Sequence, residues 1–122
     1  MTGIHGNRKL GTLEPGAVIG IIGGGQLGRM TAIAANHLGF KTAVLSERPE
    51  DPATHVANHH IPSTFDDPAG LTKLAELADV VTYELEQLPI TALQFLAPIV
   101  PIVPGIQALQ VAQDRINEKT FL

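Results

Sequence analysis

Apolar and amphipathic stretches alternate along this chain. Residues 17–22 are apolar except for Gly20 and are followed at once by three glycines, a pattern typical of a strand buried on both faces. Further short apolar runs predict strands at residues 41–45, 60–62, 79–83 and 99–103. Pro101 interrupts the last of these, which favours an edge position or the end of a strand.

Helical patterns separate the strands. From Gln26 on, apolar residues recur on one face of a predicted helix, with Gly39 as its C-cap glycine, and this stripe comprises Leu27, Met30, Ala34 and Leu38. Asp67 and Pro68 predict a second helix, because aspartate is a good N-cap acceptor and proline suits the first helical position. Its apolar stripe comprises Leu71, Leu74, Ala75 and Ala78. Residues 54–58 predict one helical turn and residues 89–96 a short helix.

This alternation determines the expected fold class. Strands that alternate with helices at short spacing are joined by parallel, right-handed crossovers. We therefore expect an α/β fold, a Rossmann-like doubly wound parallel sheet of four or five strands, over residues 17–105. Residues 1–16 are interpreted as a flexible leader and residues 106–122 as a helical segment. That segment ends on Phe121 and Leu122 without a capping glycine, so we expect the natural polypeptide to continue.

Composition narrows the classes of function. The 122 residues are 44% hydrophobic, which supports one folded unit, and the formal net charge of -4 removes the basis for binding nucleic acid or an anionic membrane. There is no cysteine, so neither disulfides nor thiol chemistry are expected. No stretch is long and apolar enough for a membrane span, and the first residues do not resemble a secretory signal. We expect a soluble, cytoplasmic protein that acts on a small molecule.

The strongest motif is a glycine-rich loop between the first strand and the first helix. Residues 23–28 read GGGQLG and satisfy the pattern G-x-G-x-x-G. Such glycines allow a tight turn, close approach of a ligand and close packing of the helix, whose N-terminus attracts anions. One interpretation is a dinucleotide site in which Glu47 holds ribose hydroxyls, although Glu47 follows Ser46 rather than closing the strand. Another is that the glycines serve packing alone.

The wider sequence resembles a known family of enzymes. The run IGIIGGGQLGRM at residues 19–30 is similar to the start of N5-carboxyaminoimidazole ribonucleotide synthetases, and its QLGRM part is much narrower than the generic fingerprint. Further stretches agree in order and spacing: HVA at 55–57, DVVTYELE at 79–86, QDR at 113–115 and EKTFL at 118–122. The resemblance implies that residues 17–105 form a pre-ATP-grasp domain and that residues 106–122 lead into an ATP-grasp domain absent from this chain.

The resemblance also implies an activity for the full enzyme. Enzymes of that family are ATP-dependent ligases of purine biosynthesis that add bicarbonate to 5-aminoimidazole ribonucleotide, using ATP and magnesium, to give N5-carboxyaminoimidazole ribonucleotide. ATP and magnesium would be bound by the absent domain, so we expect this chain alone to be inactive and to carry no catalytic residue. Related enzymes are commonly dimers, and a homodimer is therefore an expectation here.

Three other functions stay open at this point. A glycinamide ribonucleotide transformylase of the same superfamily would share the fold and the loop, but it usually carries an acidic residue at the position of Gln26. A nicotinamide-dependent oxidoreductase would use the glycine fingerprint. The third alternative is a domain that acts only as an interaction module.

The resemblance implies a set of substrate-binding residues. Gly25, Gln26 and Leu27 at the loop and Glu84 after a predicted strand would contact the sugar phosphate. Glu84 would lie at a strand's carboxyl end, where ligands of open α/β sheets bind and where its carboxylate accepts hydrogen bonds from ribose hydroxyls. Without the resemblance, Glu84 and Glu86 would be interpreted as solvated loop acids.

Further residues receive weaker assignments. Tyr83 and Glu86 are second-rank substrate contacts, and Arg29 is either a phosphate partner or an ordinary surface cation. Three histidines raise a metal hypothesis through their spacing: His55, His59 and His60. With no cysteine and no convergent carboxylates nearby, we interpret them as surface histidines and expect no metal site in this chain.

Overall fold

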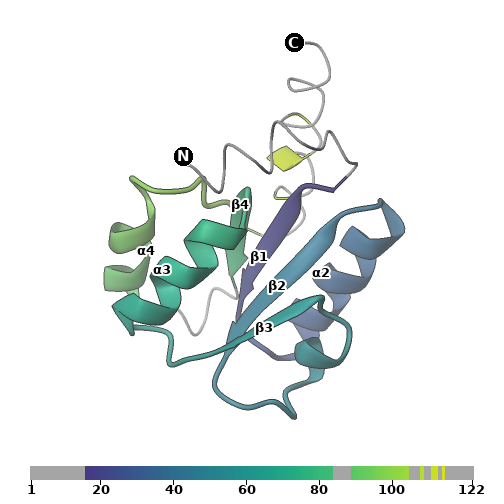
Figure 1. Ribbon diagram of the computed structural model, residues 1–122, viewed down its shortest axis with the longest axis horizontal. Helices are drawn as coiled ribbons and strands as arrows, with labels where there is room; N and C mark the ends of the chain where they lie inside the picture. Colours follow the sequence, from purple (N-terminus) through teal and green to yellow (C-terminus); the bar gives the residue numbers. More distant parts are fainter. Residues whose placement is uncertain (1–15, 84–88, 105–107, 109–110, 113, 115–122) are drawn as a thin grey trace.

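The computed structural model describes residues 16–83, 89–104, 108, 111–112 and 114 (Figure 1). Its elements follow in the order β1 (Val18–Ile22), α2 (Gln26–His37), β2 (Lys41–Ser46), η1 (Pro52–His55), β3 (His59–Pro62), α3 (Pro68–Leu77), β4 (Val80–Tyr83) and α4 (Ile90–Leu96). The predicted leader, apart from Gly16, and most of the predicted segment 106–122 lie outside the described residues. The domain boundaries therefore stay predictions.

The four strands form one parallel sheet in the order β3-β2-β1-β4. Figure 1 shows α2 on one side of this sheet and α3 with α4 on the other. The expected α/β, doubly wound parallel sheet is confirmed. β1 lies in the interior of the sheet, paired with β2 on one side and β4 on the other, which explains why its five residues are all buried.

Two cores cover the two faces of the sheet. Alternate residues of β1 point to opposite faces, so Ile19 and Ile21 belong to the α2-side core with Ala32 and Ala35, while Val18 and Ile22 belong to the α3-side core. The remaining buried members of the α3-side core include Leu71, Leu74, Ala75 and Ala78, as predicted from the stripe of the second helix. Ala108 and Ala112, both helical, are buried in the α2-side core.

Helix α2 buries a different face from the predicted one. Of the predicted apolar stripe, Leu27 is 64% exposed and Met30 62% exposed, and Leu38 is also exposed. The buried residues are instead small, namely Gly28, Ala32 and Ala35. Small side chains let the helix axis approach the sheet closely, which is the packing role of the third glycine in the fingerprint. The prediction was therefore wrong for the larger residues Leu27, Met30 and Leu38, whereas Ala34 is partly buried and packs against the α2-side core.

The end of α2 confirms the predicted glycine cap. Gly39 has a φ of 88°, the left-handed region in which glycine has no steric penalty. The Gly39 N–H donates to the carbonyl of Asn36 at 3.0 Å, and the Phe40 N–H donates to the carbonyl of Ala35 at 2.9 Å. These two bonds form a Schellman motif, and the buried ring of Phe40 directs the chain into β2.

The start of α3 also follows its sequence signal. The side chain of Asp67 accepts a hydrogen bond from the Ala69 N–H at 3.0 Å, and Pro68 occupies the first helical position.

A buried carboxylate lies just before β4. The side chain of Asp79 accepts a hydrogen bond from the Val18 N–H at 2.9 Å. This bond ties the beginnings of β1 and β4 together.

Two predicted elements differ from the observed ones. The predicted strand at residues 99–103 is reduced to a single parallel bridge between Ile102 and Val81, because Ile99 and Val100 are still in the turn that follows α4. The Val81 N–H donates to the carbonyl of Pro101 at 2.9 Å, so proline, which has no N–H, contributes as an acceptor. The predicted turn at residues 54–58 lies earlier, as the 3-10 helix η1.

Candidate functional site

The glycine loop connects β1 to α2 at the carboxyl edge of the sheet. Gly23 has a φ of 120°, which only glycine adopts without strain, and its N–H donates to the carbonyl of Leu45 in β2 at 3.0 Å. Gly25 is the N-cap of α2, and its carbonyl accepts from the Arg29 N–H at 2.9 Å. No side chain among the described residues caps this helix, and its first turn has no acidic residue that would neutralise the partial positive charge of its N-terminus.

Gly24, the position that the fingerprint leaves free, is enclosed by the segment after β2. A Cβ placed on Gly24 would lie 2.6 Å from the Cβ of Asp51 and 2.9 Å from the Cβ of Ser46. The Gly24 carbonyl accepts a hydrogen bond from the N–H of Ala53 at 2.8 Å. A glycine is therefore required here by the neighbouring loop of the same chain, independently of any ligand.

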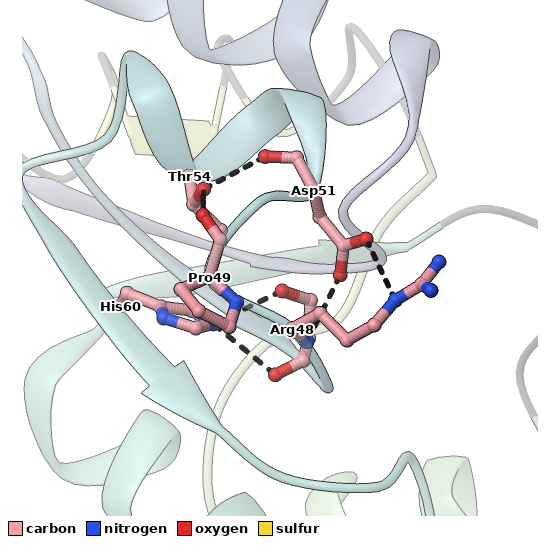
Figure 2. A network of polar contacts seen from close by, with 6 residues as sticks. Arg48, Pro49, Asp51, Thr54 and His60 are labelled. Atoms are coloured by element: carbon pink, nitrogen blue, oxygen red, sulfur yellow. Dashed lines mark hydrogen bonds and ion pairs between the residues drawn. The ribbon is translucent and has the colours of Figure 1, made fainter.

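That neighbouring loop is braced by its own polar contacts (Figure 2). The Asp51 carboxylate accepts from the N–H of Arg48 at 3.2 Å and forms an ion pair with its guanidinium at 3.7 Å. The Thr54 hydroxyl lies 2.6 Å from the carbonyl of Pro49 and 2.7 Å from that of Asp51. Because the guanidinium side chain of Arg48 is 70% exposed, its ion pair adds little stability, and the backbone contacts hold the loop.

Ser46, the last residue of β2, contacts the side chain of His60 in β3. The Ser46 hydroxyl, on a residue only 1% exposed, lies 3.1 Å from His60 Nε2, and the same nitrogen lies 3.2 Å from the Ser46 carbonyl. A carbonyl oxygen only accepts, so the contact with it is a hydrogen bond in the tautomer that carries the hydrogen on Nε2. The Ser63 N–H donates to the same carbonyl at 3.0 Å.

These contacts argue against the dinucleotide interpretation. A dinucleotide fold uses the end of its second strand to hold ribose hydroxyls and leaves its glycines open to the pyrophosphate. Here Ser46 is buried against His60 at that strand end, and Asp51 packs against Gly24, which lies between the first two glycines of the fingerprint. Glu47, the predicted ribose ligand, is simply exposed.

The structure brings part of the predicted site to one edge. The pairing of Ile22 with Tyr83 places the end of β4 beside the start of the glycine loop. Gln26 and Leu27 are exposed in the first turn of α2, and Gly25 is half-buried. Tyr83 is half-buried, but it packs against the α3-side core, on the opposite face of the sheet from α2.

Other predicted site residues are placed differently or not at all. Arg29 is exposed on the surface of α2. Glu84 and Glu86 lie outside the described residues, so their roles stay predictions. The helical spacing assumed for the histidines is absent, because His55 is in η1 whereas His59 and His60 are in β3. Within the described part of the chain, no three histidine or acidic side chains form a group able to hold a metal ion.

Sequence reasoning passed over Thr82, the residue before Tyr83. It is 3% exposed, and its hydroxyl oxygen has no hydrogen-bond partner among the described residues. The available signal was a hydroxyl residue inside an otherwise apolar strand.

Among the described residues, no helix combines the length and the apolar character needed to cross a bilayer.

The family is decided by sequence comparison. Residues 17–113 match the family described as the ribonucleotide synthetase preATP-grasp domain. The chain belongs to this family. The matched region is continuous and contains the parallel sheet, the glycine loop after β1 and the end of β4 at Tyr83.

Comparison with individual proteins gives the same family. The chain is 48% identical over 111 residues to the N5-carboxyaminoimidazole ribonucleotide synthase of Brucella melitensis, covering 91% of this chain and 31% of the relative. The crystal structure of N5-carboxyaminoimidazole ribonucleotide synthetase from Thermus thermophilus is 45% identical, with a TM-score of 0.66 over 84% of this chain and 28% of that one.

A third similar protein was solved with ligands bound. The N5-carboxyaminoimidazole synthase of Aspergillus clavatus, in complex with ADP and 5-aminoimidazole ribonucleotide, is 36% identical and has a TM-score of 0.65 over 79% of this chain and 26% of that one. The chain thus spans about a third, or less, of the length of the relatives that it matches. These matches do not favour the oxidoreductase or the transformylase alternative.

Proposed function

We propose that this chain is the amino-terminal part of an ATP-dependent ligase that carboxylates 5-aminoimidazole ribonucleotide to N5-carboxyaminoimidazole ribonucleotide in purine biosynthesis. The observation that carries the proposal is the family match over residues 17–113, joined to 48% identity with a synthase of that name. The contribution of this chain would be part of the ribonucleotide site.

The described geometry supports a ligand at the carboxyl edge of the sheet. Open α/β sheets bind ligands outside the carboxyl ends of their strands, where the strand order reverses. In this sheet that point lies between β1, which runs into the glycine loop, and β4, which ends at Tyr83. Gln26 and Leu27 are exposed there, and the uncapped N-terminus of α2 favours an anionic group such as a phosphate.

The rest of the reaction would be performed elsewhere in the longer ligase. ATP supplies the free energy for forming the carbon–nitrogen bond, and we assign ATP, magnesium and bicarbonate to the ATP-grasp part. A homodimer remains a prediction from the resemblance, and a cytoplasmic location remains a prediction from the composition.

Calorimetric titration tests the proposal. The chain, and a longer polypeptide that includes the ATP-grasp part, are titrated with 5-aminoimidazole ribonucleotide and with NAD. We expect the ribonucleotide to bind and Gln26→Ala and Glu84→Ala each to weaken its affinity about 10-fold, as for the loss of one hydrogen bond to a polar ligand. Glu76→Gln, on the exposed surface of α3, is the control and should leave the affinity unchanged.

Each outcome has a distinct meaning. Ribonucleotide binding by the longer polypeptide alone would show that the site needs both parts. Binding of NAD without binding of the ribonucleotide to either protein would overturn the proposal. Turnover of ATP by the 122-residue chain alone would contradict the assignment of catalysis to the absent part.

A further inference from the structure

The hydroxyl of Thr82 is an exception to the rule that buried polar groups are hydrogen-bonded. Thr82 is 3% exposed, and its Oγ1 has no hydrogen-bond partner among the described residues. A buried hydroxyl without a partner destabilises a fold. Valine has nearly the same shape and has no group that needs a partner, so the contacts among the described residues do not account for a threonine here.

The position of Thr82 in the sheet places it beside the glycine loop. It pairs with Ile21, and the next pair, Ile22 with Tyr83, ends β4 and immediately precedes Gly23. Val80 belongs to the α2-side core and Val81 to the α3-side core. By the alternation of a strand, the side chain of Thr82 points to the α2 side, the face onto which the glycine loop leads the chain.

Two independent features therefore meet at this edge of the sheet. The twelve-residue helix α2 begins there with no acidic residue in its first turn and with no side-chain cap from the described residues. The neighbouring strand contributes a hydroxyl that has no hydrogen-bond partner in the described part of the chain. A hydroxyl both donates and accepts, so it can bond to a phosphate oxygen, a ribose hydroxyl or a ring nitrogen.

We propose that Thr82 is a substrate-binding residue whose hydroxyl receives its hydrogen-bond partner when the sugar phosphate enters the site. This inference rests on the proposed function and adds a residue to it. The oxygen is buried without the ligand. Rotation about the Cα–Cβ bond exchanges the places of the hydroxyl and the methyl group between staggered wells, so the direction of the hydroxyl changes without movement of the strand.

Two substitutions separate this role from a structural one. Thr82→Val removes the hydroxyl and keeps the shape, whereas Thr82→Ser keeps the hydroxyl. The free energy of unfolding is measured in urea, and the affinity for 5-aminoimidazole ribonucleotide is measured by calorimetry on the chain and on the longer ligase polypeptide. Thr72→Val, at an exposed position of α3, is the control for loss of a hydroxyl.

We expect Thr82→Val to unfold at the same or a higher urea concentration than the wild type and to bind the ribonucleotide about 10-fold more weakly. Thr82→Ser should bind within about 3-fold of the wild type, and Thr72→Val should bind like the wild type. A lower unfolding midpoint for Thr82→Val would show a structural partner for the hydroxyl and overturn the inference. Unchanged affinity of Thr82→Val, with the wild type binding, would overturn the inference and leave the proposed function standing. Absence of binding to both wild-type proteins would overturn both.

Discussion

Gly24 lies against Asp51 so closely that a Cβ on the glycine would come within 2.6 Å of the Cβ of Asp51. The two residues belong to different loops, one after β1 and the other after β2. A hydrogen bond from the Ala53 N–H to the Gly24 carbonyl, 2.8 Å long, holds the loops together. The glycine loop is thus shaped by the second crossover as well as by its own sequence.

This contact predicts the effect of Gly24→Ala. The added methyl group forces the two loops apart, and we expect the free energy of unfolding to fall by about 1–3 kcal/mol, as for other overpacking substitutions. Urea denaturation followed by circular dichroism measures the change. Asp51→Gly removes the nearest clashing atoms, so the double variant should lose less stability than the sum of the two single variants. Strict additivity would contradict the proposed cause.

The observed orientation of α2 predicts opposite responses at two positions of one helix. Ala35 is 0% exposed and Met30 is 62% exposed. Ala35→Leu should lower the free energy of unfolding by about 1–3 kcal/mol through overpacking against the sheet. Met30→Lys should change it by less than about 0.5 kcal/mol. Thermal or urea unfolding of both variants measures this, and a larger loss for Met30→Lys would favour the face predicted from the sequence pattern.

The bond between Asp79 and Val18 predicts a graded series. Asp79→Ala removes the acceptor of the buried Val18 N–H, and we expect a loss of about 1–3 kcal/mol in the free energy of unfolding. Asp79→Asn keeps an oxygen acceptor and should lose less. Glu76→Ala, at an exposed position, is the control and should be close to neutral. Equal losses for Asp79→Ala and Asp79→Asn would show that the negative charge, rather than the hydrogen bond, is what stabilises the fold.

Several features were predictable because their signals are local. A continuous apolar run indicated β1, and the cap residues Asp67 and Gly39 marked a helix start and a helix end that the structure confirms. In α3 the large apolar residues are also the buried ones, so Leu71 and Leu74 were predicted correctly as core. The glycine loop was recognised in the same way, from a pattern of six consecutive residues.

The sequence by itself determined the order of strands and helices, the glycine loop and the family, because hydrophobic runs, capping residues and motifs are properties of short segments. Tertiary structure decided which face of α2 is buried, since the close approach of this helix to the sheet selects Gly28, Ala32 and Ala35 over larger side chains. It also placed Asp51 against Gly24 and buried the hydroxyl of Thr82 where no described residue is its hydrogen-bond partner. These relationships join residues far apart in the chain, and their energies depend on distances that no local pattern contains.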